Sequence, residues 1–172
     1  MSRHEDLIAE GEPEAEFQPG IAGILPRKRV SGGALIRDRD GRILFIEPTY
    51  KPLLDIPGGI AEPDESPYDA CRREVLEEVG LELTIGPMLV VDWDPARGVW
   101  HDALAFVFDG GVLTGDEQLV LQPSEVRTAA FLTLDEAEPQ MRPSMHRRLT
   151  LAVHALQTGI PQYSDFGRPR TA

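Results

Sequence analysis

The alternation of apolar runs and turn residues near the start of the chain predicts a β-hairpin over residues 30–48. An apolar run at 34–36 is followed by Asp40-Gly41, and a second apolar run occupies 43–46. Asp-Gly pairs suit tight turns between antiparallel strands, because both central positions of such turns take a positive φ. The two apolar runs are therefore expected to pair as neighbouring strands.

Three later segments have the β-branched and aromatic composition of strands. They cover residues 82–94, 102–113 and 125–134. The middle segment is closed by Gly110-Gly111, which favours a turn there. Together with the hairpin, these segments predict a sheet whose strands are separated by helices.

Three helical segments complete the pattern: 67–79, a short turn at 135–137, and 144–158 with Gly159 as its end. Apolar side chains of the last segment recur at helical spacing, at Met145, Leu149, Val153 and Leu156. A hairpin, a helix, further strands and a final helix predict an α/β fold with a mixed sheet covered by helices.

The flanking segments differ in composition from this central region. Residues 1–27 are rich in acidic residues, proline and glycine, and are expected to form an arm. Residues 28–160 would form the domain, and residues 161–172 a C-terminal tail. Such an arm could also reach a second subunit in a homodimer.

The helix at 67–79 has clear start and stop signals. Ser66 is a good N-cap, Pro67 fits the first helical position, and Asp69 stands where a capping-box acid would. Gly80 accepts the left-handed conformation that ends many helices. The apolar side repeats every four residues, at Cys71, Val75 and Val79.

Acidic residues gather on another side of this helix. Glu74, Glu77 and Glu78 are spaced i, i+3, i+4 and share a face, with Arg73 beside them. Three carboxylates arranged in this way resemble a site for a hard cation such as Mg²⁺. The alternative is a solvated acidic face whose repulsion Arg73 offsets.

Length and charge restrict the classes of partner. The chain has 172 residues and a net charge of −12, which disfavours a nucleic acid polymer as ligand. A small phosphate ligand stays compatible, because a bound cation can reverse the local field. No apolar run approaches the ~20 residues of a membrane span. The single cysteine, Cys71, fits a reducing compartment, so we expect a cytoplasmic protein without a membrane partner.

The spacing of glycine and charged residues over 59–81 resembles the Nudix box. The matching positions are Gly59, Glu65, Arg73, Glu74, Val75, Glu77, Glu78, Gly80 and Leu81. The hairpin before the box and the strand that ends at Phe131-Leu132 extend the resemblance to about residues 28–157. Asp64 departs from the pattern, since many members have glycine there, and this predicts a stiffer loop.

This resemblance implies a Nudix-type α/β/α sandwich and metal-assisted hydrolysis of a diphosphate linked to another moiety. Mg²⁺ or Mn²⁺ would neutralise the diphosphate charge and make bound water more acidic. The implied substrates are nucleoside diphosphates linked to another group, including nucleotide sugars and nucleoside triphosphates. The alternative is a Nudix-fold ligand sensor with little turnover, which the intact glutamate set disfavours.

The resemblance also assigns roles to individual residues. Arg73 and Glu65 would orient the metal ligands. The general base would be Glu77 or Glu78, or else the loop residue Glu125, for which a solvated loop residue is an equal reading. The implied metal ligands are the Gly59 carbonyl, Glu74, Glu77 and Glu78.

Further candidates lie outside the box. Trp93, Trp100 and His101 could stack on a base, although packing is the commoner role of tryptophan. Arg97 and Lys51 could meet phosphate, and solvated charge is the commoner explanation for them.

Overall fold

The computed structural model describes residues 3–10 and 15–170 of the chain. Its strands are β1 (Arg29–Arg37), β2 (Ile43–Pro48), β3 (Gly58–Ile60), β4 (Met88–Asp94), β5 (Ala103–Val112), β6 (Val126–Leu132), β7 (Gln162–Asp165) and β8 (Arg168–Pro169). Its helices are α1 (Arg3–Ala9), α2 (Ile21–Ile24), α3 (Pro67–Val79), α4 (Leu134–Ala137), the 3-10 helix η1 (Glu138–Gln140) and α5 (Pro143–Thr158). No helix in these described ranges is both long and apolar enough to cross a bilayer.

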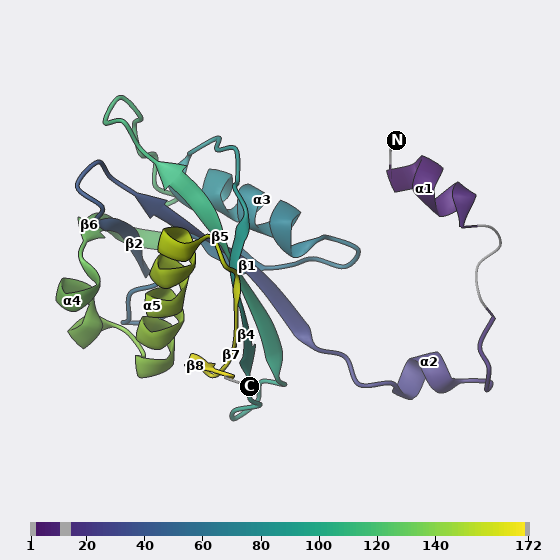
Figure 1. The fold of residues 1–172 in the computed structure, drawn as a ribbon. Helices are drawn as coiled ribbons and strands as arrows, with labels where there is room; N and C mark the ends of the chain where they lie inside the picture. The colour runs from purple at the N-terminus through teal and green to yellow at the C-terminus, as the bar shows by residue number, and fades with distance from the viewer. Residues whose placement is uncertain (1–2, 11–14, 171–172) are drawn as a thin grey trace.

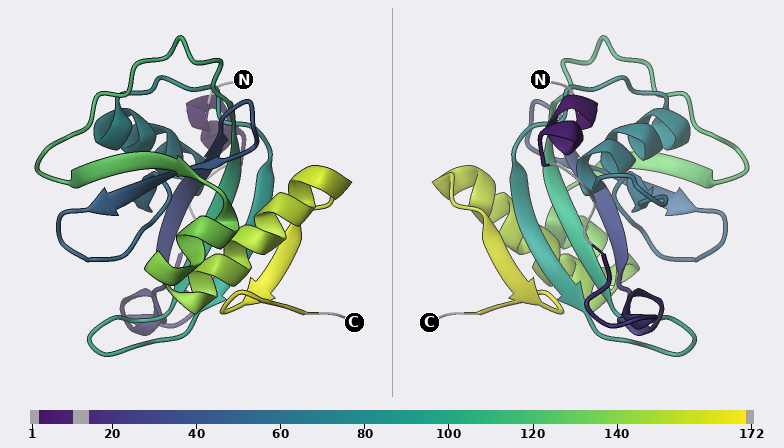
Figure 2. Two further views of the ribbon diagram at one scale, coloured as in Figure 1. Left: turned by 90° about the vertical axis from the view of Figure 1, so that its left-hand side faces the viewer. Right: turned by 90° about the vertical axis from the view of Figure 1, so that its right-hand side faces the viewer.

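The described strands form one mixed sheet in the order β6-β2-β1-β5-β4-β7-β8, and β3 pairs with β1 off this path. The pairs β1–β5 and β4–β7 are parallel and the others antiparallel. Helix α3 covers one face of the sheet and α5 the other, as Figure 1 and Figure 2 show. The predicted α/β class, with a mixed sheet between helical layers, is confirmed.

Two apolar cores fill the spaces on either side of the sheet. Successive side chains of a strand point to opposite faces, so Ala34 and Ile36 pack with α3 while Leu35 packs with α5. On the α3 side, Cys71 and Val75 are fully buried, as their spacing predicts. The burial of Cys71 raises the pKa of its thiol to about 12, so this cysteine has a packing role.

The β1–β2 hairpin is confirmed, with a turn of different length. The Asp38 N–H donates to the Arg42 carbonyl (2.9 Å), so three residues form the loop instead of a two-residue turn. Gly41 has a φ of 80°, the left-handed position that such three-residue loops require. The Asp38 carboxylate accepts from the Arg42 N–H (2.8 Å) and closes the turn.

The strand predicted over 82–94 begins only at Met88. Pro87 has no N–H to donate to a ladder, so regular pairing cannot extend through it. The Gly86 N–H instead donates to the Asp109 carbonyl (2.7 Å), and Ile85 is buried in the core. The apolar residues before Met88 therefore reflect burial of an irregular segment.

The segment assigned from its sequence to a tail forms β7 and β8. Strand β7 pairs in parallel with β4, and Ser164 is fully buried. Its hydroxyl donates to the carboxylate of Asp92, which is also fully buried (2.6 Å). A buried carboxylate needs such donors, so residues 162–169 complete the sheet.

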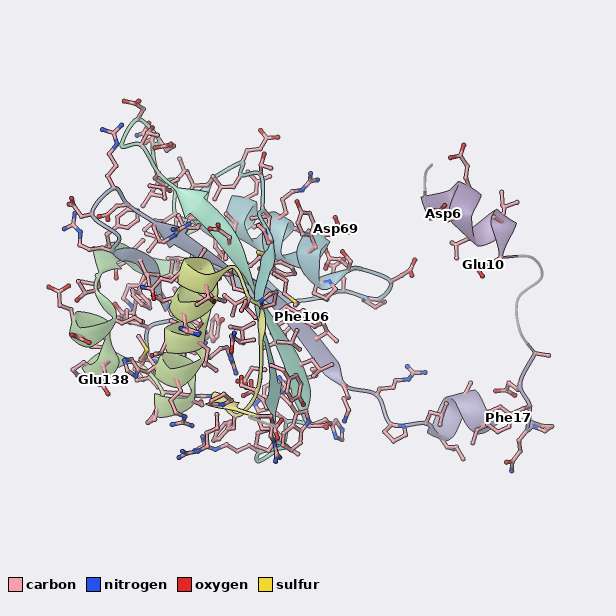
Figure 3. All side chains as sticks on the ribbon, viewed as in Figure 1. Asp6, Glu10, Phe17, Asp69, Phe106 and Glu138 are labelled. Atoms are coloured by element: carbon pink, nitrogen blue, oxygen red, sulfur yellow. The ribbon has the colours of Figure 1, made fainter. Side chains whose placement is uncertain are left out.

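The N-terminal arm projects away from the body of the molecule (Figure 1). Its large apolar side chains are exposed, and Figure 3 shows Phe17 on the arm with Asp6 and Glu10. They are Leu7, Ile8, Phe17, Ile24 and Leu25. Residues 1–2 and 11–14 of the predicted arm lie outside the described residues.

Removing residues 1–20 is expected to leave the melting temperature and any hydrolytic rate close to those of the full chain. The physical reason is that the exposed apolar side chains of the arm contribute little buried area to the domain. Thermal melting and steady-state kinetics of both proteins check this. A large loss of folding or activity would mean instead that the arm helps to build the site, for example by reaching a second subunit.

Candidate metal and substrate site

Helix α3 begins and ends where its sequence predicts. The Asp69 N–H donates to the Ser66 hydroxyl (3.0 Å), which caps the first turn after Pro67. Gly80 has a φ of 70°, and its N–H donates to the Leu76 carbonyl (3.0 Å). These ends fix the rotation of the helix and hence the direction of its acidic face.

Two consecutive glycines bring backbone against that face. A Cβ added at Gly59 would overlap the Glu74 carboxylate, so no larger residue fits there. Gly58 has a φ of 149° and lies against the backbone of Gly32 and Gly33 on β1. The Pro57-Gly58-Gly59 segment therefore lets β3 pair with β1 in the sheet while Gly59 lies directly against the Glu74 carboxylate of α3.

Arg73 organises the exposed half of the acidic face. Its guanidinium donates twice to Glu65 (2.9 Å each), and also to Glu74 (2.8 Å) and Glu77 (2.9 Å). The hydrogen bonds from Arg73 lower the pKa of Glu65 to about 2. Glu65 thus fixes the Arg73 guanidinium, and Arg73 in turn holds the Glu74 carboxylate in one orientation.

Glu78 lies in a different environment. Its side chain is buried and accepts a hydrogen bond from the Gly58 N–H (2.9 Å). The pKa of Glu78 is raised to about 8, mainly by burial and also by the nearby carboxylates of Glu74 and Glu125, and the hydrogen bond from the Gly58 N–H opposes this rise. Among the ion pairs of the described residues, none joins Glu78 to a basic side chain.

Glu125 reaches the same place from a distant part of the chain. Its carbonyl accepts from the Thr49 N–H (2.8 Å) at the end of β2. The Gln122 N–H donates to the Glu78 carbonyl (3.1 Å) and ties the same loop to the end of α3. Carboxylate oxygens of Glu74, Glu78 and Glu125 all lie within 4.8 Å of one another.

The structure thus brings together part of the residue set implied by the Nudix box. Glu74, Glu78 and Glu125 converge, and Gly59 lies against Glu74. Glu77 lies outside this group, because its half-exposed carboxylate pairs with Arg73.

The loop before Glu65 also bears on the pattern of the box. Asp64 has a φ of 65°, in the left-handed region that glycine accepts most easily. This conformation explains in physical terms why glycine suits the position where this chain carries aspartate.

The converging carboxylates fit a hard divalent cation. Ligand oxygens at 2.0–2.6 Å from one ion lie at most about 4–5 Å apart, which the group satisfies. Burial also raises the pKa of Glu74, so two of the three carboxyls are costly to ionise without a counter-charge. The low-dielectric surroundings of Glu78 would strengthen its attraction to a cation.

A cavity of about 900 Å³ opens on the α5 side of the sheet. Its floor consists of small residues, Ser31 and Gly33 on β1 and Ala103 and Ala105 on β5. Helix α5 packs on β4 and the β7–β8 hairpin, so it leaves the floor uncovered. Gly58 and Gly59 line this cavity too.

Basic residues gather around the cavity from widely separated parts of the chain. They are Arg29, Lys51, Arg97, Arg142 and Arg148. Several are already held by partners within the fold.

The Arg29 guanidinium lies 5.1 Å from the centre of the Trp100 ring and donates to the His101 carbonyl (2.8 and 3.1 Å). Arg148 donates to Asp92 (2.8 Å) and Asp94 (2.6 and 2.7 Å). These contacts hold two basic side chains of the cavity in fixed positions.

The candidates outside the box divide into two groups. Trp100, Arg97 and Lys51 line the cavity, and Lys51 pairs with the lining residue Asp55. Trp93 and His101 are not among the lining residues, and the indole N–H of Trp93 donates to Asp102 (3.0 Å).

Sequence reasoning missed Arg29, Arg142, Arg148 and Phe166, which also line the cavity. They lie up to 137 positions apart, as the numbers 29 and 166 show, and no local spacing connects them. The usable signal was the run of small residues at alternate positions in 31–33 and 103–105.

A family model of the NUDIX domain matches residues 27–152. A "MutT-like protein" of Streptomyces ambofaciens is 32% identical over 124 residues, which cover 72% of this chain and 76% of that protein. A CTP pyrophosphohydrolase of Escherichia coli is 40% identical over 63 residues, which cover 34% of this chain and 47% of that protein.

Solved structures share the fold. A MutT protein from Methanosarcina mazei superposes with a TM-score of 0.63 at 24% identity, covering 78% of this chain and 98% of that one. A UDP-X diphosphatase superposes with a TM-score of 0.67 at 19% identity, covering 96% of this chain and 76% of that one. An ADP-ribose pyrophosphatase from Streptococcus suis gives a TM-score of 0.61 at 22% identity, covering 81% of this chain and 99% of that one.

Proposed function

The chain belongs to the Nudix family of hydrolases, which act on acid anhydrides in phosphorus-containing compounds, and we propose that it cleaves a nucleoside diphosphate linked to another moiety. The proposed reaction is a pyrophosphohydrolysis that depends on Mg²⁺ or Mn²⁺. Water attacks one phosphorus of the diphosphate, the bridging P–O bond breaks, and two phosphate monoesters leave.

One observation carries this proposal. Gly58 and Gly59 line the cavity, and they also contact the glutamates, through the Gly58 N–H on Glu78 and the close approach of Gly59 to Glu74. A diphosphate in this part of the cavity would lie beside the acidic group. A cation held by that group would neutralise the charge of the diphosphate oxygens and act as a Lewis acid.

The residues of the chain then have distinct tasks. Glu74, Glu78 and Glu125 would hold the cation, with the Gly59 carbonyl as a further oxygen ligand. Arg73 and Glu65 would keep Glu74 oriented through their paired hydrogen bonds. Glu125 is the exposed member of the three, so we assign to it the acceptance of a proton from the attacking water. Glu77 would act through its ion pair with Arg73.

The shape and charge of the cavity support a substrate with groups on both sides of the diphosphate. A volume of about 900 Å³ lies near the upper end of the range for small-molecule sites. Arg97 and Arg142 add positive charge, and Trp100, which is 58% exposed, adds an apolar surface. Among the solved structures with this fold are enzymes named for UDP-X and ADP-ribose, both of this substrate type.

A substrate panel tests the proposed function. The purified chain is incubated with Mg²⁺ or Mn²⁺ and with nucleotide sugars, ADP-ribose, dinucleoside polyphosphates and nucleoside triphosphates. Release of a nucleoside monophosphate from at least one of them is expected, and none with EDTA. No hydrolysis across the panel by a folded protein would refute the proposal, and tight nucleotide binding without turnover would favour the ligand sensor.

A further inference from the structure

The turn between β7 and β8 places a phenylalanine in an unfavourable backbone conformation. Asp165 pairs with Arg168, so Phe166 and Gly167 form a two-residue loop with φ values of 53° and 73°. Turns with two positive φ values favour Asn-Gly, because most side chains clash with their own backbone there. A bulky residue is destabilised in the left-handed region, and asparagine tolerates this region better.

Several contacts hold this turn in place. The Phe166 N–H donates to the Trp93 carbonyl (2.8 Å), and the Gly167 N–H donates to buried Asp92 (2.8 Å). The Arg147 guanidinium donates to the Phe166 carbonyl (2.7 Å). A Cβ at Gly167 would lie only 2.6 Å from the Ser144 carbonyl oxygen, so the turn packs directly on α5. Several independent contacts therefore fix the backbone of this turn, and a backbone fixed in this way can hold a residue in a strained conformation.

Phe166 lines the cavity opposite the glycine turn of the acidic group. The residue is 38% exposed, with the Arg147 guanidinium 5.9 Å from the centre of its ring. Across the sheet, β3 and β7 are separated by the strands β1, β5 and β4. Four steps of about 4.8 Å put roughly 19 Å between β3 and β7.

We propose that Phe166 is a specificity-determining residue, whose ring stacks on a planar ring of the substrate while the diphosphate lies in the part of the cavity between that ring and Gly58-Gly59. The inference rests on the proposed function, since it assumes a substrate with a nucleobase. It explains why a strained position, where asparagine would cost less, carries an aromatic side chain facing a cavity. Arg142 and Arg148, which line the cavity near it, would meet phosphate or ribose oxygens.

The test uses Phe166→Asn, Phe166→Leu and Phe166→Trp in the full chain, with Phe17→Asn on the exposed arm as the matched control. Equilibrium dialysis with Mg²⁺ measures the Kd of ADP and UDP, which carry a base, and of inorganic pyrophosphate, which does not. Thermal melting reports folding, and steady-state kinetics on any hydrolysed substrate separate KM from kcat.

We expect Phe166→Asn to melt at or above the temperature of the wild type, because asparagine fits the turn. Its Kd for the nucleotides should rise about tenfold or more, in line with base–aromatic stacking, with pyrophosphate binding unchanged. KM should rise with little change in kcat, Phe166→Leu should behave in the same way, and Phe166→Trp should bind as the wild type does.

Unchanged nucleotide affinity in Phe166→Leu or Phe166→Asn would overturn the inference, as would an equal loss for pyrophosphate. Phe166→Leu decides the question if the asparagine variant does not fold. A wild type that binds nucleotides without hydrolysing them would refute the proposed function. The Kd values of the wild type and the variants would still test the stacking role of Phe166 in that case. A wild type that binds none of the nucleotides would refute the role of Phe166.

Discussion

Replacing Glu78 with glutamine is expected to lower the hydrolytic rate by ~10²-fold or more, which corresponds to ~2.7 kcal/mol in the barrier. Glutamine keeps the volume of the side chain and an oxygen that can accept the Gly58 N–H, so the fold should persist. The change removes one charge from the acidic group, where a cation would be held. Steady-state rates of Glu78→Gln and wild type at saturating Mg²⁺ or Mn²⁺ measure the effect.

Two further variants sharpen this comparison. Glu62→Gln is the matched control, since Glu62 is exposed and lies outside the acidic group, and it should retain the wild-type rate. Glu77→Gln distinguishes two roles for Glu77. The resemblance to the Nudix box makes it a metal ligand, whereas the structure pairs it with Arg73. A loss as large as that of Glu78→Gln would place Glu77 on the cation. If Glu77→Gln and Glu78→Gln both keep the wild-type rate, the assignment of the site is wrong.

Divalent cations are expected to raise the melting temperature of the chain. Binding to the folded state alone adds about 2.7 kcal/mol at a free cation concentration 100-fold above Kd. For a chain of this size that is about 5–10 °C. Thermal melting with Mg²⁺, Mn²⁺ or EDTA measures the shift, and NaCl at matched ionic strength should produce less.

The dependence of this shift on pH follows from the buried carboxyl. The pKa of Glu78 is raised from 4.5 to about 8 in the folded state, so between these values the folded chain binds more protons than the unfolded chain. The contribution of the Glu78 carboxyl to the stability of the metal-free protein is therefore fully present below pH 4.5. This contribution is lost as the pH rises through about 8. Cations need the ionised form, so their stabilising effect should grow over the same interval.

The control for this experiment removes the converging carboxylates together. The variant Glu74→Gln, Glu78→Gln, Glu125→Gln should lose most of the cation-induced shift and should melt higher than the wild type in EDTA, since mutual repulsion is gone. A Glu62→Gln, Glu82→Gln variant should keep the shift. Equal shifts in the wild type and the triple variant would mean that the cation binds elsewhere, and the acidic face would then be ordinary solvated charge.

Local signals in the sequence predicted α3 and the hairpin well. The helix runs from Pro67 to Val79, between Ser66 and Gly80, because capping and glycine termination act over one turn and need no tertiary partner. The spacing of Glu74 and Glu78 within that helix also placed both on one face. Chemistry of this kind depends only on residues that are close in the chain, so the sequence alone is enough to predict it.

Features that depend on distant partners were not predictable in this way. Strand β7 is four residues long and polar. It forms because it pairs with β4 and because the Ser164 hydroxyl donates to the carboxylate of Asp92. The carboxylate of Glu77 pairs with Arg73, one turn earlier in the helix, instead of joining Glu74 and Glu78, and the helical spacing is compatible with either arrangement. Glu125 was recognised from the family and not from its surroundings, because the pairing of β2 with β6 positions its loop.

The sheet order has a consequence for the kinetics of folding. Gly32 pairs with Phe106 and Val91 with Tyr163, so both parallel ladders join segments more than 70 residues apart. Chains dominated by such non-local pairings fold slowly, since a large loop must close before its contacts form. Glu125 can join the other two glutamates only when β6 has paired with β2, so we expect the cation to bind only to chains in which this pairing has formed. Such a ligand slows unfolding more than it speeds folding, and it would lengthen the lifetime of the native state.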